Sequence, residues 1–224
     1  MISIAIDGPS GVGKSTLAKE LASKLQFVYV DTGALYRAIG LYVLNQNKNT
    51  EIEQEVVPLL SEITVEIKFV DGTQRVFLNS EDVTDAIREH RVSKAASDVS
   101  AFPKVREFLL SLQRDIATKN NVIMDGRDIG TVILPNADLK IFLTAQPKER
   151  AKRRQLQLAE KGEQVEFETV LADIKQRDFN DTNRATAPLK QADDAVLIDS
   201  TEYSFEYTLD KLYGLIKEKC NELL

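Results

Sequence analysis

The sequence predicts an α/β fold in which five parallel strands form a sheet that helices cover on both faces. Short apolar runs rich in β-branched residues alternate with amphipathic helical stretches, which is typical of a sheet built from strand–helix–strand units. The first apolar run leads directly into a glycine-rich loop and then a helix. A length of 224 residues suits one domain with an insertion or a mobile flap.

The expected strands are short, apolar and bounded by loop residues. The first ends at Asp7, immediately before Gly8-Pro9. Strands of a parallel sheet are buried on both faces, so they read as nearly continuous apolar runs. By this criterion, strands are expected at residues 2–7, 27–30, 121–124, 139–143 and 195–198.

Helices are expected between these strands. From Lys14 to Leu25, apolar residues recur at intervals of three and four, which indicates an amphipathic helix. Further helices are expected from about Leu35, at residues 105–116, from about Pro147, and at residues 165–179 and 205–223. Right-handed crossovers then place the carboxyl ends of the strands, and with them the ligand, at one edge of the sheet.

One segment departs from this pattern. Apolar and polar residues alternate from Ile63 to Phe69, and the alternation resumes at Val76 after Asp71-Gly72. Alternation around an Asp-Gly pair is a β-hairpin signal. The sequence therefore predicts a small antiparallel insertion whose turn lies at Asp71-Gly72.

The composition limits the range of partners. The formal net charge is -6, whereas nucleic-acid binders usually carry a basic excess. The N-terminal apolar run is too short for a signal peptide, and no apolar run reaches the length of a membrane span. We therefore expect a cytoplasmic protein without nucleic-acid or membrane partners. Since no apolar helix face stands out, a monomer is expected.

The segment from Gly8 to Ser15 matches the phosphate-loop pattern of glycine, four residues, glycine, lysine and serine or threonine. Its glycines let successive backbone N–H groups converge on a phosphate, and the helix that follows adds its positive end. Lys14 is expected to reach the β- and γ-phosphates, and the Ser15 hydroxyl to ligate Mg²⁺. The expected ATP-binding residues are Gly8, Pro9, Ser10, Gly11, Val12, Gly13, Lys14, Ser15 and Thr16.

A nucleoside triphosphate site of this kind serves small-molecule kinases and GTP-dependent switches. A switch would need a guanine-reading motif of the Asn-Lys-x-Asp type, and the nearest candidate, Thr118-Lys119-Asn120-Asn121, lacks the carboxylate. Arginines near carboxylates are abundant instead, and fixed cations stabilise the charge that develops during phosphoryl transfer. The kinase interpretation is therefore favoured. A phosphate acceptor is already ionised at neutral pH, so no general base is required.

Three further motifs follow in order, beginning at Asp31 (DTGALYR), Asp125 (DGRDIGT) and Arg177 (RDFNDTNR). Together with the phosphate loop and the stretch from Ser97 to Arg106, they make the chain resemble bacterial cytidylate kinases over essentially its whole length. The resemblance implies the P-loop fold of nucleoside monophosphate kinases, with ATP, Mg²⁺ and the acceptors CMP and dCMP as ligands, and UMP as a poorer acceptor.

The resemblance also implies a division of the single domain formed by residues 1–224. A core comprises about 1–31, 105–147 and 190–224. A monophosphate-binding part with the antiparallel insertion comprises about 32–104, and a helical lid about 148–189. The closest rival kinases on this scaffold would act on adenylate, thymidylate or small metabolites.

Individual roles follow from the same resemblance. Lys14, Arg177 and Arg184 are implied to be catalytic, with Arg177 beside the transferring phosphoryl group. The implied acceptor-binding residues hold the phosphate (Thr32, Arg37, Arg127, Arg184), read the cytosine edge (Ser97, Arg106, Asp128) or hold the sugar hydroxyls (Asp181). The chemistry agrees, because an arginine fork matches a phosphate and a carboxylate can accept from the cytosine amino group. On a helix, positions 177, 181 and 184 would share one face.

Simpler interpretations remain open at several positions. Arg37 could pair with a neighbour on its helix, Asp128 could cap the strand end and pair with Arg127, and Arg177 could form a surface pair with Asp181.

Other positions are equally open. The hydroxyls of Thr32 and Ser97 could cap turns or helices. Asp125 could contact water of the metal or cap the end of its strand. The arginines at positions 150, 153 and 154 could touch ATP phosphates or form a solvated helix face.

Overall fold

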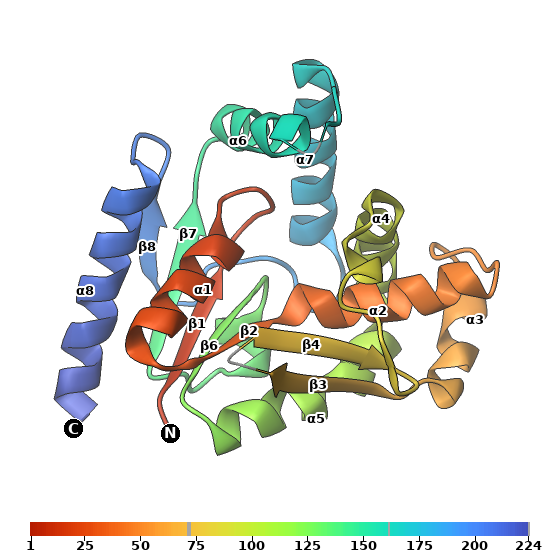
Figure 1. Ribbon diagram of the computed structural model, residues 1–224, viewed down its shortest axis with the longest axis horizontal. Coiled ribbons are helices and arrows are strands. Elements are labelled where there is room, and N and C mark those ends of the chain that lie inside the picture. Colours follow the sequence, from red (N-terminus) through yellow and green to blue (C-terminus); the bar gives the residue numbers. More distant parts are fainter. Residues whose placement is uncertain (71–72, 161, 224) are drawn as a thin grey trace.

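The computed structural model describes residues 1–70, 73–160 and 162–223, and its centre is a five-stranded sheet in the order β2-β6-β1-β7-β8 (Figure 1). Every neighbouring pair in this sheet is parallel. The strands are Ser3–Asp7 (β1), Val28–Asp31 (β2), Val122–Gly126 (β6), Leu139–Thr144 (β7) and Val196–Asp199 (β8). The predicted fold class is confirmed, and each strand boundary lies within two residues of its expected position.

Helices connect the strands as expected. The α-helices are Lys14–Leu25 (α1), Thr32–Asn45 (α2), Glu53–Val56 (α3), His90–Val99 (α4), Pro103–Lys119 (α5), Pro147–Glu160 (α6), Phe167–Asn183 (α7) and Phe205–Leu223 (α8). Short 3₁₀ segments span Val57–Glu62 and Ala86–Arg88, and a π-helical turn spans Ile129–Ile133. None of the helices in the described ranges has the length and apolar character needed to cross a membrane.

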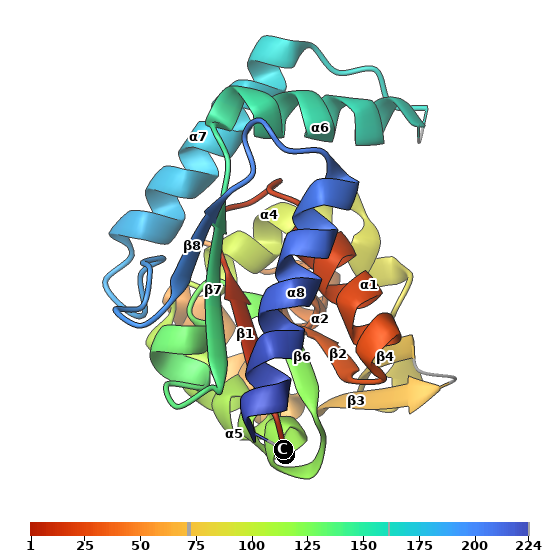
Figure 2. The same ribbon diagram turned by 90° about the vertical axis from the view of Figure 1, so that its left-hand side faces the viewer.

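The sheet has a separate apolar core on each face. Ile4 and Ile6 of β1 pack with α1 and α8, whereas Ala5 packs with α5 and the π-helical turn. Figure 2 shows α1 and α8 side by side on one face of the sheet. Since alternate residues of a strand point to opposite faces, covering both faces requires apolar residues at consecutive positions. This explains the continuous apolar character of β1.

The first glycine after β1 has no room for a side chain. Gly8 has φ +153°, and a Cβ atom built there would lie 2.0 Å from the backbone oxygen of Leu143 in β7. The phosphate loop therefore leaves the sheet by passing directly against the neighbouring strand, a close approach that only glycine permits.

Replacing Gly8 with alanine is expected to lower the free energy of unfolding by about 3 kcal/mol or more, because two backbones would have to move apart. Urea unfolding of the variant would measure the loss. Gly214 provides the matched control. It lies in α8 with nothing within 4 Å of a built Cβ, so Gly214→Ala should stabilise the protein by up to about 1 kcal/mol. Equal effects at both positions would contradict the steric argument.

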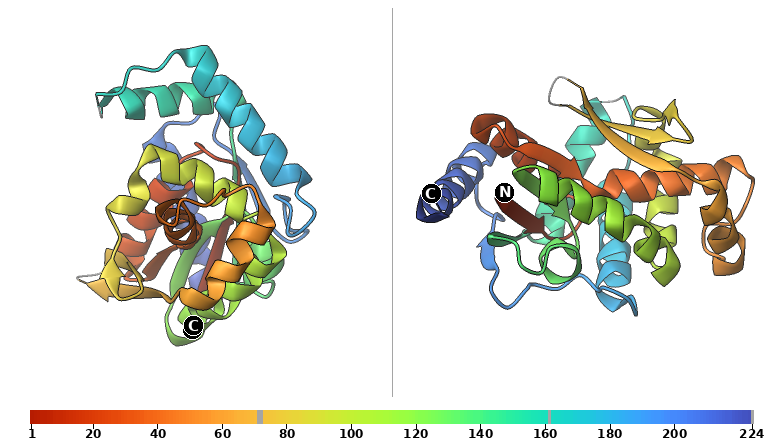
Figure 3. Two further views of the ribbon diagram at one scale, coloured as in Figure 1. Left: turned by 90° about the vertical axis from the view of Figure 1, so that its right-hand side faces the viewer. Right: turned by 90° about the horizontal axis from the view of Figure 1, so that it is seen from below.

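The predicted antiparallel insertion is confirmed as a small sheet, which we call the inserted sheet: Val65–Val70 (β3), Thr73–Leu78 (β4) and Glu81–Asp82 (β5). The expected turn at Asp71-Gly72 lies outside the described residues. Figure 3 shows β3 and β4 beside α2. Val65, Val76 and Leu78 join a core cluster with α2, α4 and α5. The inserted sheet is therefore fixed to the helices by apolar packing.

Helices α6 and α7 form an arm above the carboxyl ends of the strands (Figure 1). The arm has a small core of its own, which contains Ala151, Leu158, Val170, Leu171 and Ile174. Phe167–Asn183 extends four residues beyond the expected end of this helix at Phe179. The arm coincides with most of the expected lid.

Candidate active site

The phosphate loop joins β1 to α1, and the side chain of Lys14 forms a hydrogen bond across it. Lys14 is 5% exposed, and its Nζ donates to the backbone oxygen of Pro9 at 2.8 Å. Gly13 caps α1 with φ +95° and offers no side-chain acceptor, so the first N–H groups of the helix are available to an anion. Burial, followed by the nearby Arg127, lowers the pKa of Lys14 to about 7. A phosphate beside this amine would favour its charged form.

The hydroxyl expected to bind magnesium lies against a buried carboxylate. Ser15 Oγ donates to Asp125 Oδ2 at 2.8 Å, and the Tyr29 hydroxyl donates to Asp125 Oδ1 at 3.0 Å. The Ser15 hydroxyl and the Asp125 carboxylate are hard oxygen groups of the kind that Mg²⁺ prefers. Within the described ranges, no group of three or more acidic, cysteine or histidine side chains could hold a metal. The donor set therefore fits an ion held by few protein oxygens together with phosphates, as is usual for Mg²⁺.

A pocket of about 90 Å³ lies between the carboxyl end of β6, helices α2 and α4, and the arm. We call it the arginine pocket. It brings together every acceptor-binding residue that the resemblance implies, together with Arg177. Its lining residues are Thr32, Tyr36, Arg37, Ser93, Ala96, Ser97, Ser100, Arg106, Gly126, Arg127, Asp128, Arg177, Asp181 and Arg184.

Charge in the arginine pocket is strongly positive, although the whole chain is acidic. Five arginines line it, against two aspartates. A neighbouring hollow of about 210 Å³ shares Ser97, Ser100, Asp181 and Arg184 and extends toward Glu51 and Phe102. A local cationic cluster beside the phosphate loop can thus bind an anionic ligand that the net charge of the chain would not attract.

The two aspartates pair with arginines that lie far away in the sequence. Asp128 accepts from Arg106 and, at 3.3 Å, from Arg184; these three side chains are only 5–8% exposed. Asp181 accepts from Arg127 Nε at 2.8 Å. Although burial alone would raise the pKa of Asp181, Arg127 holds it below its usual value. The simpler pairings of Arg127 with Asp128 and of Arg177 with Asp181 are therefore wrong.

Other expected residues are held locally. Arg37 Nη2 lies 2.5 Å from Asp31 Oδ2, at the start of its own helix, so the local-pair interpretation applies to Arg37 even though the side chain lines the pocket. Thr32 Oγ1 donates to the backbone oxygen of Asp125 at 2.7 Å. Ser97 lies on α4, and its backbone oxygen accepts from the Ser100 hydroxyl.

Arg177 differs from the other arginines of the pocket. Its guanidinium makes no hydrogen bond or ion pair with any described residue, although it lines the same pocket. Burial, followed by repulsion from Arg127, lowers its pKa. Although the nearby Asp181 attracts it, a guanidinium that no carboxylate hydrogen-bonds is suited to bind an anionic group.

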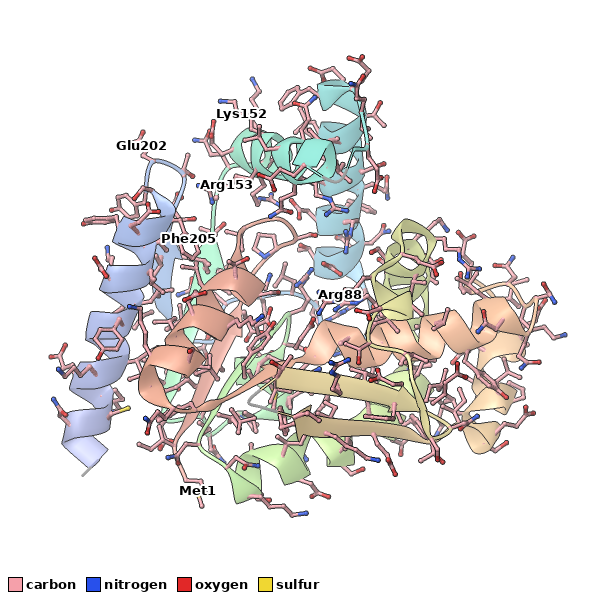
Figure 4. The ribbon with its side chains drawn as sticks, in the orientation of Figure 1. Met1, Arg88, Lys152, Arg153, Glu202 and Phe205 are labelled. Carbon is pink, nitrogen blue, oxygen red and sulfur yellow. The ribbon has the colours of Figure 1, made fainter. Side chains whose placement is uncertain are left out.

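Two of the three arginines near the start of α6, Arg150 and Arg153, are held by hydrogen bonds and do not belong to a solvated face. Arg150 is 3% exposed and donates to the backbone oxygen of Ser10, at 2.9 Å, and to Asp178 Oδ1, also at 2.9 Å. Figure 4 shows Arg153 on the same helix, above the phosphate loop. Arg153 donates to the backbone oxygen of Ser200 at 2.7 Å. The arm is thus tied to the phosphate loop through Arg150, a contact that the sequence did not predict.

Two further residues support the pocket without having been expected there. Asp7 accepts from the backbone N–H groups of Ile129 and Gly130 at 2.8 and 2.7 Å, and burial raises its pKa to about 6. Asp7 could have been assigned to the site from the sequence, because it ends a predicted parallel strand, where ligands bind in such sheets. The ring centroid of Tyr36 lies 5.3 Å from the Cζ atom of Arg106. In the sequence, only its position next to Arg37 indicated that Tyr36 could belong to the site.

The chain is similar to cytidylate kinases over almost its whole length. The family model described as Cytidylate kinase matches residues 4–218. A cytidylate kinase from Caldicellulosiruptor saccharolyticus is 54% identical over 215 residues, which cover 96% of this chain and 95% of that protein. One from Carboxydothermus hydrogenoformans is 47% identical over 221 residues, 99% of each chain.

Solved structures agree at the level of the fold. A gluconokinase from Sinorhizobium meliloti aligns with a TM-score of 0.50 at 13% sequence identity, over 99% of this chain and 95% of that chain. The family model and the curated relatives confirm the resemblance drawn from the motifs. The chain therefore belongs to the cytidylate kinase family and is a nucleoside monophosphate kinase.

Proposed function

We propose that the protein transfers the γ-phosphoryl group of ATP to CMP and dCMP, and more weakly to UMP, giving ADP and the nucleoside diphosphate. The observation that supports this proposal most strongly is the arginine pocket, in which five arginines and two aspartates lie beside the phosphate loop. A site of this composition suits an acceptor that carries a phosphate and hydrogen-bonding groups.

On the donor side, the phosphate loop would hold ATP through its backbone N–H groups, and Lys14 would contact the β- and γ-phosphates. Ser15, with Asp125 behind it, would hold Mg²⁺. The ion supplies charge neutralisation on the phosphate oxygens when it is bound. Arg153 or Arg154, on α6 of the arm, would contact the phosphates of ATP.

On the acceptor side, Arg37, Arg127 and Arg184 would hold the phosphate, with Thr32 beside them. The base would be read by Ser97, Arg106 and Asp128. Asp128 keeps acceptor positions for a base amino group, since a carboxylate has about four lone-pair sites and its two arginines occupy only part of them. Asp181 would accept from the sugar hydroxyls.

Transfer would be direct and in line. Arg177 would stabilise the charge on the transferring phosphoryl group, and the acceptor phosphate would act as nucleophile without a general base. The arm would serve as a lid that closes over the donor and excludes water, the competing acceptor. We propose the same division as the resemblance implies: the core, the monophosphate-binding part and the lid of residues 148–189, within a cytoplasmic monomer.

The proposal is tested by ADP release from Mg·ATP, with CMP, dCMP, UMP, AMP, GMP, dTMP or no acceptor in parallel. Strong turnover with CMP and dCMP, and weaker turnover with UMP, is the expected result. Turnover with a purine monophosphate or dTMP alone would keep the kinase chemistry but remove the roles given to Ser97, Arg106 and Asp128. If no acceptor raised ADP release above the water control, the proposed reaction would be wrong.

A further inference from the structure

Besides apolar packing of Ile67 and Phe69 against the core of the parallel sheet, the inserted sheet makes a reciprocal pair of hydrogen bonds with the edge of that sheet. The backbone N–H of Asp31 donates to Gln74 Oε1 at 2.8 Å, and Gln74 Nε2 donates to the backbone oxygen of Asp31 at 3.2 Å. Asp31 is the last residue of β2, which lies at the edge of the five-stranded sheet. Figure 1 shows β4 beginning beside β2. The Gln74 amide therefore takes the place of a neighbouring strand at this edge.

Asp31 in turn holds two groups with its carboxylate. Oδ1 accepts from the backbone N–H of Ala34 at 3.1 Å and so caps α2, while Oδ2 pairs with Arg37 Nη2 at 2.5 Å. Arg37 lines the arginine pocket. The contacts thus form a continuous series from the inserted sheet to a pocket arginine, in which Gln74 fixes the backbone of Asp31 and the Asp31 carboxylate fixes Arg37.

We propose that Gln74 is a positioning residue, which sets Asp31 and, through it, the Arg37 guanidinium for the acceptor phosphate. The proposal rests on the proposed function, since it needs Arg37 to bind that phosphate. It gives the inserted sheet a role in phosphate binding, in addition to any part in base recognition. The half-buried side chain of Gln74 makes both hydrogen bonds, so water competes only partly for the Asp31 backbone groups.

A purely structural role for Gln74 is not sufficient to explain this arrangement. Val65, Val76 and Leu78 already bury the inserted sheet in the core cluster with α2. Attachment of the sheet therefore does not depend on two amide hydrogen bonds. What those bonds add is local, because they fix the backbone at the position where β2 ends and α2 begins.

The test is Gln74→Met, which keeps a side chain of similar length and removes both hydrogen bonds. Because Arg37 would hold the acceptor phosphate equally in the ground state and the transition state, loss of its alignment should raise KM for the acceptor about three- to ten-fold. The kcat and the KM for ATP should stay within about two-fold. Arg75→Ala is the matched control, since the next side chain along β4 pairs with Asp82 instead.

A double-mutant cycle separates positioning from general damage. Once Arg37→Ala has removed the guanidinium, adding Gln74→Met should produce no further rise in the acceptor KM. If Gln74→Met lowers the melting temperature, Gln74→Glu provides a second comparison. It keeps an acceptor for the Asp31 N–H but loses the donor, so its KM should also rise while the control variant stays unchanged.

Three results would overturn the proposal: an unchanged acceptor KM in Gln74→Met, an equal rise in both substrates' KM values, or a full effect that persists in the Arg37→Ala background. Failure of the proposed function is a separate outcome, because it would appear in the wild-type protein as a lack of turnover with CMP. If another monophosphate is the acceptor, its KM is the quantity to compare, since Arg37 is assigned to the phosphate and not to the base.

Discussion

Replacing Arg177 with alanine is expected to reduce kcat and kcat/KM together by about 10³-fold or more, with little change in the KM for either substrate. An arginine that stabilises the transferring phosphoryl group contributes roughly 10³–10⁵ in rate, and an interaction made mainly in the transition state affects kcat and kcat/KM equally. Steady-state kinetics with Mg·ATP and CMP would measure both constants.

The folded state should not suffer from this change. Arg177 makes no ion pair with a described residue, and the repulsion from Arg127, Arg154 and Arg37 opposes the attraction of Asp181. Because these effects oppose each other, Arg177→Ala should change the melting temperature little. Lys175→Ala is the matched control, because that lysine is exposed on the same helix. A loss of less than about ten-fold in kcat would contradict the proposal that Arg177 stabilises the transferring phosphoryl group.

Replacing Asp128 with asparagine is expected to lower the ratio of kcat/KM for CMP to that for UMP by about ten-fold or more. A carboxylate can accept from the cytosine amino group, whereas an amide can also donate to the uracil oxygen, and a well-placed pair of this kind discriminates by about 1–3 kcal/mol. Parallel measurements with CMP and UMP would give the ratio.

Asp128→Ala is the more severe change. It would leave the guanidinium groups of Arg106 and Arg184 buried without their carboxylate, which is expected to cost about 3–5 kcal/mol of unfolding free energy. Urea unfolding would measure that cost. Asp173→Asn, at an exposed position on α7, controls for the loss of a charge. An unchanged CMP:UMP ratio in Asp128→Asn would refute the base-reading role.

Most of the fold could be predicted because its signals are local. The boundaries of α1, Lys14–Leu25, followed from the phosphate-loop pattern at one end and apolar spacing at the other. The end of α7 did not follow, because residues after Phe179 are polar and give no periodicity. Its last turn contains Asp181, which pairs with Arg127 on another element. This pairing joins the end of α7 to a residue far away in the sequence, so a local pattern could not predict it.

The structure brings the expected acceptor-binding residues into one pocket, but their pairings were not predicted. The sequence left open that neighbours such as Arg127 and Asp128 pair with each other. The structure instead pairs Arg106 with Asp128 and Arg127 with Asp181. These contacts depend on how the arm and α5 approach β6, which no local pattern determines. The same holds for Arg150, whose contact with the backbone of Ser10 joins two distant segments.

The strand order also constrains how the chain can assemble as it is synthesised. Strand β1 is synthesised before the other strands of its sheet, but its two neighbours are β6 and β7, which begin only at Val122 and Leu139. The apolar residues of β1 must therefore remain unpaired until synthesis has reached Val122, a period in which chaperones can act on them. By contrast, the core cluster around the inserted sheet draws its buried residues only from Ala34 to Leu109. This cluster can thus be completed before the central sheet has its middle strands.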